Sequence, residues 1–290
     1  MVVVQPTDAL ATPVARNVHI VDELIEERAP SWVAKRSWPL IRPLLYRLLD
    51  YRKAVRLADA LKPMRGQEAI DHCSDLLGLK VTTSGLERVP PRGRLVVIVN
   101  HPTGIADGVA VYDALKAVRP DMIFFANADA FRVAPGFGDI LIPVEWVEAK
   151  RTREKARQTL TLARAALEAE RALVVFPAGR ISRRRNGVVA DPEWAPSAVS
   201  LARKHDAPVA PIRMTGPYST LFHLFDGVSN ELRDITLFHE LLNKRGDRYR
   251  LTIGPLVPHD ALEGDAGEIT ERLKAYIERV LPNDPDRPFR

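Results

Sequence analysis

Short apolar runs alternate with longer, helix-like stretches from residue 79 to residue 281. In runs such as LVVIVN (95–100) and ALVVFP (172–177), consecutive residues are apolar, which is typical of strands covered on both faces. Between such runs, stretches such as 106–118 repeat their apolar residues with the period of a helix. The alternation predicts an α/β fold, with a mixed, largely parallel sheet flanked by helices on both faces.

The predicted elements follow one another in a simple order. The strands are LKVTTSG (79–85), LVVIVN (95–100), DMIFFAN (121–127), GDILIPVEWV (138–147), ALVVFP (172–177), APVAPIRM (207–214) and RYRLTIGPLV (248–257). The helices cover 106–118, 152–171, 195–206, 221–245 and 266–281. We expect Thr152 to cap the second of these helices, and the fourth to be interrupted near Gly227.

The chain before residue 79 differs from the rest. Residues 18–79 are predicted to be helical, with breaks at Ala29-Pro30-Ser31 and at Lys62-Pro63, and residues 1–18 carry no periodic signal. A chain of 290 residues with 46% hydrophobic residues is long enough for one large α/β domain with a helical extension. We therefore place a helical N-terminal segment at 1–79 and an α/β domain at 80–290.

Residues 39–56 form an amphipathic, basic segment that is expected to be one helix. Pro39 and Pro43 fall in or near the first turn, where proline is least disruptive. Leucines and Ile41 occupy one half of the helical wheel, while Arg42, Arg47 and Lys53 occupy the other. Such a helix suits an anionic membrane surface, although a helix packed on the protein body with a solvated basic face has the same pattern.

Targeting and redox features suggest where the protein works. The chain begins without the basic region of a signal peptide, and no apolar stretch approaches the ~18 residues of a membrane-spanning helix. Cys73 is the one cysteine, which excludes a disulfide framework and favours a reducing compartment. We expect a cytoplasmic protein that lies peripherally on the inner face of the cytoplasmic membrane.

Several catalytic signatures are missing from the sequence. It contains no G-x-S-x-G elbow and no P-loop, HELLN (239–243) lacks the second histidine of a zinc protease, and GFGDIL (136–141) lacks the third glycine of a dinucleotide loop. With one cysteine and scattered histidines, no cluster has the spacing of a metal site. We therefore expect neither a metal nor a cofactor.

The stretch NHPTGIADG (100–108) is the strongest catalytic candidate. His101 follows a buried-type strand, and ligands of open α/β sheets bind at the carboxyl ends of strands. Gly104 lets the backbone turn back, so that the Asp107 carboxylate can reach the imidazole and orient it. A lone histidine is usually structural. Here, however, the pair can act as a general base toward a hydroxyl or amine of the substrate.

A second candidate is the loop FPAGRISRRRNG (176–187), which follows another strand. Gly179 permits a tight turn, and Arg180 stands nearest the strand end in a chain whose net charge is +5. Arginine offers paired donors to phosphate or carboxylate, so the loop suits an anion, whereas Arg183 to Arg185 also fit a solvated basic loop. Arg151 and Arg153 add positive charge at the start of a helix.

The order of these elements resembles a known family. NHPTGIAD, GDILIPVEW with its basic stretch, FPAGRIS and APVAPIRM are similar to the four sequence blocks of the glycerolipid acyltransferases, over about residues 80–260. The hemolysin-like bacterial branch is the most similar. The resemblance implies that His101, held by Asp107, deprotonates an acceptor hydroxyl that attacks an acyl-CoA or acyl-carrier-protein thioester. It also implies a substrate site, expected at Gly104, Arg151, Arg153, Phe176, Pro177, Gly179, Arg180 and Ser182.

Three departures from the family pattern leave the acceptor open. Five residues separate His101 from Asp107 instead of four, FPEGTRS has become FPAGRIS with Ala178 in place of the acid, and Trp146 stands where arginine is common. A lysophospholipid or glycerol phosphate is the first expectation, and an ornithine-type, amino-acid-containing lysolipid is the second. A non-catalytic lipid-binding protein and an acyl-CoA hydrolase are further alternatives. We expect an anionic membrane surface as a partner, and no nucleic acid.

Overall fold

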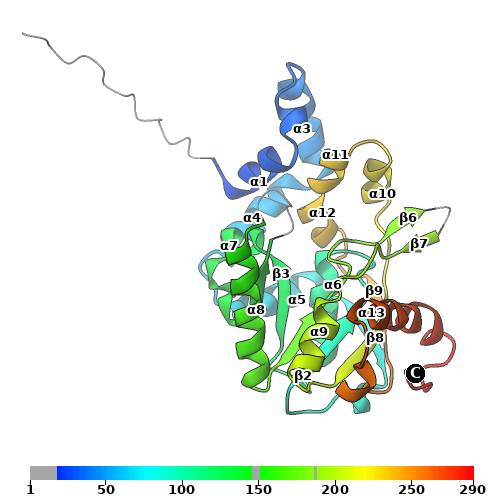
Figure 1. The fold of residues 1–290 in the computed structure, drawn as a ribbon. Coiled ribbons are helices and arrows are strands. Elements are labelled where there is room, and N and C mark those ends of the chain that lie inside the picture. Colours follow the sequence, from blue (N-terminus) through cyan, green and yellow to red (C-terminus); the bar gives the residue numbers. More distant parts are fainter. Residues whose placement is uncertain (1–17, 146–150, 186–187) are drawn as a thin grey trace, which may run out of the picture.

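A seven-stranded mixed sheet forms the centre of the protein, in the order β1-β9-β8-β2-β5-β3-β4 (Figure 1). The computed structural model describes residues 18–145, 151–185 and 188–290. The strands of this sheet are β1 (Lys80–Ser84), β2 (Leu95–Val99), β3 (Ile123–Asn127), β4 (Leu141–Val144), β5 (Ala172–Val175), β8 (Val209–Thr215) and β9 (Arg248–Ile253). β8 and β9 pair antiparallel, and the other described pairings within the sheet are parallel. The predicted fold class is therefore confirmed.

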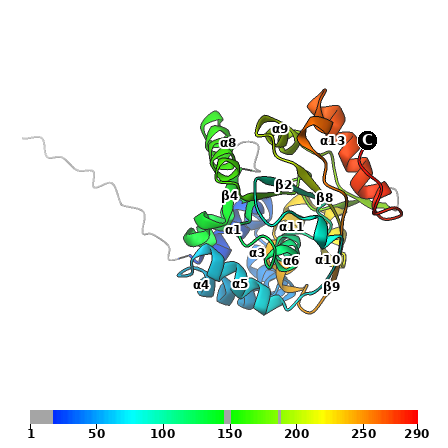
Figure 2. The ribbon, with the colours of Figure 1, turned by 90° about the horizontal axis from the view of Figure 1, so that it is seen from below.

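Helices cover both faces of the sheet, as Figure 2 shows. α5 (Gly66–Leu77) and α6 (Ile105–Leu115) pack on one face. α8 (Arg153–Glu168), α9 (Ser197–Lys204) and α13 (Ala266–Ala275) pack on the other, and α13 continues as a π-helical turn over Tyr276–Val280. β2 lies between the two layers, and its five apolar residues are completely buried. As predicted, Thr152 caps α8, because its side chain accepts a hydrogen bond from the Lys155 amide.

The N-terminal helices form a separate layer at the top of Figure 1. They are α1 (Ile20–Arg28), α2 (Pro30–Val33), α3 (Trp38–Leu48) and α4 (Tyr51–Leu61). With α7 (Asp129–Val133) and the helices of residues 220–242, they enclose a third apolar cluster. The boundary near residue 80 stays a prediction, and residues 1–17 lie outside the described part.

The prediction of one helix over residues 39–56 was wrong. The helix is interrupted at Asp50, whose backbone is left-handed with φ 55°. The Asp50 carboxylate pairs with Lys53 at 2.7 Å and with His239 at 3.3 Å. These partners hold the break, so Lys53 belongs to α4 and its charge is paired.

Two other segments also differ from the prediction. Residues 221–245 form three short helices, α10 (Thr220–Asp226), α11 (Asn230–Asp234) and α12 (Leu237–Leu242), so a second break follows the expected one near Gly227. The arginine loop contains a hairpin of β6 (Arg183–Arg185) and β7 (Val188–Ala190). The two residues between these strands, Asn186 and Gly187, lie outside the described part of the chain.

Among the described residues, no helix combines the length and the apolarity needed to cross a bilayer.

Candidate active site

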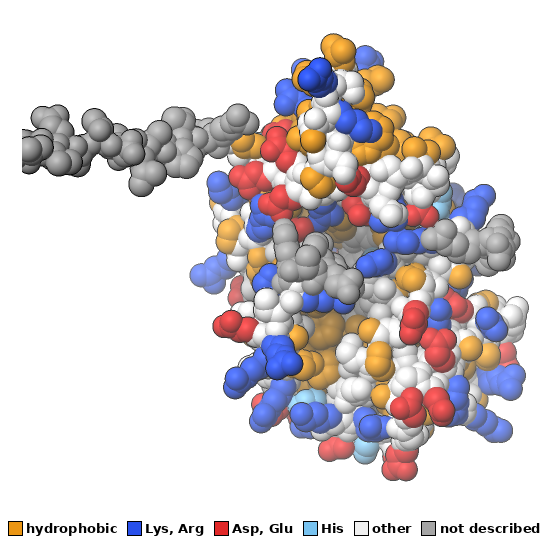
Figure 3. Space-filling model, turned by 45° about the horizontal axis from the view of Figure 1, so that its top comes forward, with side chains coloured by type: hydrophobic (Ala, Val, Ile, Leu, Met, Phe, Trp, Pro, Cys, Tyr) orange, Lys and Arg blue, Asp and Glu red, His pale blue; other side chains and the backbone are white. Residues whose placement is uncertain are grey.

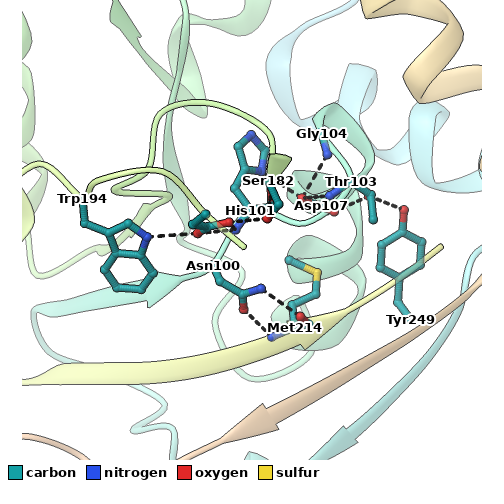
Figure 4. A network of polar contacts seen from close by, with 10 residues as sticks. Asn100, His101, Thr103, Gly104, Asp107, Ser182, Trp194, Met214 and Tyr249 are labelled. Carbon is teal, nitrogen blue, oxygen red and sulfur yellow. Dashed lines mark hydrogen bonds and ion pairs between the residues drawn. The ribbon is translucent and has the colours of Figure 1, made fainter. Parts of the chain in front are cut away.

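The carboxyl ends of neighbouring strands bring the two candidate motifs together. β2 pairs with β5 so that Ile98 lies opposite Val175, and the NHPTG and FPAGR turns therefore leave the sheet side by side. The contact is direct, because the Ser182 amide donates to the His101 carbonyl at 2.9 Å. Asn100 fixes the end of β2 to β8: its side chain donates to the Met214 carbonyl at 2.9 Å and accepts from the Met214 amide at 2.7 Å. Figure 4 shows this network.

His101 and Asp107 are in contact, as the sequence predicted. The imidazole Nδ1 lies 2.8 Å from Asp107 Oδ2. The same oxygen accepts from the Thr103 amide at 2.9 Å and the Gly104 amide at 3.1 Å, and the Thr103 hydroxyl donates to Oδ1. Because each of these neighbours donates, the carboxylate acts as an acceptor and His101 Nδ1 carries the hydrogen. This arrangement leaves Nε2 as the free acceptor of the neutral ring.

Glycine is required at position 104 to make this geometry. Gly104 has φ +108° and ψ −142°, a conformation open to glycine and strained for other residues. A Cβ there would also lie 2.8 Å from the end of the Ile181 side chain. The turn places Asp107 in the first turn of α6, with its side chain pointing back at the loop. In this structure, Gly104 therefore makes the turn and donates its amide to the Asp107 carboxylate. The predicted contact of Gly104 with substrate stays a prediction.

The two members of the pair differ in exposure. The Asp107 side chain is fully buried, whereas the His101 side chain keeps 18% of its surface exposed. The Phe176 ring packs beside the imidazole, with the ring centroids 4.6 Å apart. The histidine is thus held on one side and open on another, which suits proton transfer to a bound substrate.

Thr103 links the pair to Tyr249, a residue that the sequence analysis missed. The Thr103 hydroxyl gives its hydrogen to Asp107, so Tyr249 donates to it across 2.7 Å. Burial raises the pKa of the Tyr249 phenol, and the Asp107 charge raises it further. Tyr249 reaches the site because β9 is antiparallel to β8, so that β9 begins at the edge of the sheet where β8 and β2 end. No local sequence pattern signals such a contact.

The FPAGRIS turn (residues 176–182), called the third-block turn below, lies beside His101. Gly179 has φ +59°, which confirms the predicted tight turn, and Arg180 follows it with an exposed side chain. Pro177 is buried, and its carbonyl accepts from the Ala195 amide. The buried Ser182 hydroxyl donates to Asp191, so the structure shows it in an internal contact rather than one open to substrate.

Arg151 and Arg153 lie farther away on the same edge of the sheet. They follow β4, which is separated from β2 by β5 and β3, or about 14 Å at the usual strand spacing. Arg151 Nε donates to the Glu145 carbonyl at 3.2 Å, and both side chains are exposed. Trp146 falls outside the described residues. Within the described ranges, no three His, Cys, Asp or Glu side chains are grouped so as to hold a metal ion.

The chain is similar to a protein family, to two relatives and to a solved structure. Residues 80–215, from β1 to the end of β8, match the family model described as Acyltransferase. A lyso-glycine lipid O-acyltransferase from Phocaeicola vulgatus is 28% identical over 200 residues, which cover 67% of this chain and 70% of that protein. A protein of the same name from Bacteroides thetaiotaomicron is 25% identical over 269 residues, or 90% of this chain and 95% of that protein. The crystal structure of the 1-acyl-sn-glycerophosphate acyltransferase PlsC from Thermotoga maritima aligns with 93% of this chain and 97% of its own, with a TM-score of 0.48 and 13% identity.

Proposed function

We propose that this chain, which belongs to the glycerolipid acyltransferase family, uses His101 to acylate the hydroxyl of a lysolipid with an amino-acid head group. The acyl group would come from acyl-CoA or acyl-carrier protein. The observation that carries the proposal is the partly exposed imidazole of His101, whose Nδ1 is held by the buried Asp107 carboxylate. The match to the acyltransferase family and the names of the relatives argue against a non-catalytic lipid-binding protein.

The chemistry follows from the orientation of the ring. Nε2 of His101 removes the proton of the acceptor hydroxyl while that oxygen attacks the thioester carbonyl carbon. Asp107 stabilises the imidazolium that forms. The tetrahedral intermediate then collapses, the carbon–sulfur bond breaks, and the imidazolium returns the proton to the thiolate.

The acceptor class rests on two observations. The two relatives are both named for a lyso-glycine lipid, which is close to the second of the acceptors expected from the sequence. An amino acid linked through its amine presents a carboxylate, and Arg180 is an exposed cation on the turn that contacts His101. A lysophospholipid or glycerol phosphate presents a phosphate to the same arginine and is the competing acceptor.

Mass spectrometry of the products tests this function directly. The purified protein is given one labelled acyl thioester and a pool of lyso-glycine lipid, lyso-ornithine lipid, lysophosphatidic acid and glycerol 3-phosphate. We expect label in the amino-acid lipids. Label only in phosphatidic acid or its precursor would move the assignment to phosphate acceptors. Free labelled fatty acid as the sole product would indicate a hydrolase.

Replacing Arg180 with alanine should weaken acceptor binding. A hydrogen bond to a charged group contributes about 1.5–3 kcal/mol, so kcat/KM for the acceptor should fall about 10- to 100-fold, mostly through KM. The KM for the acyl donor should stay close to its original value. Arg164→Ala, on the exposed face of α8, is the matched control. An unchanged acceptor KM in Arg180→Ala would exclude this arginine from head-group binding.

We further propose that the helical layer binds an anionic membrane surface. α3 buries Trp38 and Leu45 and exposes Leu40 (83%), Leu44 (73%) and Leu48. α10 packs on the same apolar cluster and, with the residues after it, exposes Leu224 and Val228. Figure 3 shows apolar side chains at the top of the molecule with Lys and Arg between them. The basic residues of this surface include Lys35, Arg36, Arg42 and Arg47, all exposed.

The double substitution Leu40→Glu/Leu44→Glu should release the protein from membranes. Burial of a leucine contributes about 1.5–3 kcal/mol, so removing two should reduce partitioning onto anionic liposomes at least about 100-fold. Sedimentation with phosphatidylglycerol vesicles measures this fraction. Leu160→Glu/Leu162→Glu, on exposed positions of α8, provides the control. Equal binding of the two double variants would exclude α3 as the membrane surface.

A further inference from the structure

A second buried carboxylate, that of Asp191, is hydrogen-bonded to the main chain of His101. Asp191 follows β7, where the hairpin register of Arg183 with Ala190 places it opposite Ser182. Asp191 is 6% exposed. The His101 amide donates to both carboxylate oxygens of Asp191, at 3.0 and 3.2 Å. The Asp191 carboxylate is therefore hydrogen-bonded to the main chain of His101, whereas the Asp107 carboxylate is hydrogen-bonded to its ring.

The same carboxylate ties three segments of the chain together. The Ser182 hydroxyl donates to Oδ1, and Trp194 Nε1 donates to Oδ2 at 3.0 Å (Figure 4). Hydrogen bonds to a buried carboxylate are the strong kind, because the acceptor carries a full charge. One acceptor thus joins His101, the third-block turn and the segment after the hairpin. In addition, the Ser182 amide donates to the His101 carbonyl.

Lys274 of α13 holds the main chain at Asp191. Lys274 Nζ donates to the Asp191 carbonyl at 3.2 Å and to the Pro192 carbonyl at 2.8 Å. Glu278, on the π-helical turn that continues α13, lies near Asp191, and burial together with the Asp191 charge raises the pKa of its carboxyl. The main chain at Asp191 is held at its carbonyl, so the carboxylate has little freedom to follow a displaced His101.

We propose that Asp191 is the positioning residue for His101, an inference that rests on the proposed function. Asp107 sets the tautomer of the ring, and Asp191 sets where the ring is. Asp191 also links the end of the β6–β7 hairpin to the His101 main chain. The distance between the general base and the turn that carries Arg180 is therefore fixed. A general base displaced by a fraction of an ångström loses rate without losing substrate affinity.

Kinetics of Asp191→Ala and Asp191→Asn test the proposal. Asp191→Ala leaves the His101 amide and Trp194 Nε1 without an acceptor, while the Ser182 hydroxyl can still donate to the His101 carbonyl, 3.2 Å away. We expect kcat to fall about 100-fold with the KM for donor and acceptor changed less than about three-fold. Asp191→Asn keeps one oxygen toward the His101 amide and Trp194 and can place its NH₂ against the Ser182 hydroxyl oxygen. We expect the asparagine to recover about ten-fold of that loss. Asp121→Asn, at the opposite edge of the sheet and paired with Arg119, controls for general destabilisation.

A second readout does not depend on activity. In Asp191→Asn, hydrogen exchange of the peptide that contains residues 100–104 should be faster, and that of β2 should be unchanged. Wild-type kcat and unchanged exchange in the Asp191 variants would overturn the positioning role. A wild-type protein that transfers no acyl group would overturn the proposed function instead, and the exchange measurement would still decide the placement of His101. If Asp191→Ala does not fold, the asparagine variant carries both measurements.

Discussion

His101→Ala should reduce the turnover of acyl transfer about 10²- to 10⁴-fold, which corresponds to the loss of a general base. The variant keeps the arginine turn and the apolar layers, so the KM values for donor and acceptor should change little. The fold should also persist, because the His101 main chain keeps its bonds to Asp191 and Ser182. Transfer from a labelled acyl thioester, followed by mass spectrometry, measures the rate.

The matched control for His101 is another histidine. His259 lies after β9, at the opposite edge of the sheet, and is exposed. His259→Ala should transfer at the wild-type rate. If His101→Ala also retained that rate, the imidazole would have no part in the reaction and the proposed mechanism would be wrong.

Asp107→Asn should reduce turnover about 10²- to 10³-fold while leaving the site assembled. The asparagine oxygen can take the place of Oδ2 and accept from His101, Thr103 and Gly104. Its NH₂ then faces the Thr103 hydroxyl, which can accept from it and turn its own hydrogen to the Tyr249 oxygen. The geometry survives but the negative charge is lost, so the imidazolium formed during proton transfer is no longer stabilised. The loss therefore measures the charge rather than the shape.

Asp113→Asn is the control for this substitution. Asp113 lies on the same helix and accepts hydrogen bonds from Ser74 and Lys116, remote from the imidazole. It should change thermal stability slightly and turnover hardly at all. Asp107→Ala is a less clean variant, because it would leave four donors without their acceptor and destabilise the fold. Wild-type turnover in Asp107→Asn would show that the carboxylate charge does not contribute.

The predicted and the missed parts of the site differ in how far apart their residues are in the chain. His101, Gly104 and Asp107 lie within one strand-to-helix turn, so their contact follows from local backbone geometry and the sequence shows it. Asp191 and Tyr249 reach the same turn from 90 and 146 residues away, through hydrogen bonds to His101 and Thr103. The sequence shows polar residues at these positions without showing their partners.

The helical extension demonstrates the same division. The leucine pattern of residues 39–49 predicted an amphipathic helix, and α3 is one. At the break, the Asp50 carboxylate lies against Lys53 and against His239, and His239 is supplied by α12. Likewise, the sequence spacing placed Lys53 on the same basic face as Arg42 and Arg47. Because the helix is interrupted, Lys53 belongs to α4 instead and pairs with Asp50. Local propensity gives helices, whereas their ends are decided by contacts with other segments.

The sequence by itself determined the α/β class, the seven strands of the central sheet in their order along the chain, and the histidine–aspartate pair, because periodicity and close spacing are local properties. Only the tertiary structure decided the order of strands in the sheet, the antiparallel β9 that brings Tyr249 to the site, and the carboxylate of Asp191 against the His101 amide. These features depend on which buried surfaces meet and which buried donors then find an acceptor, and such pairings exist only once the chain is folded.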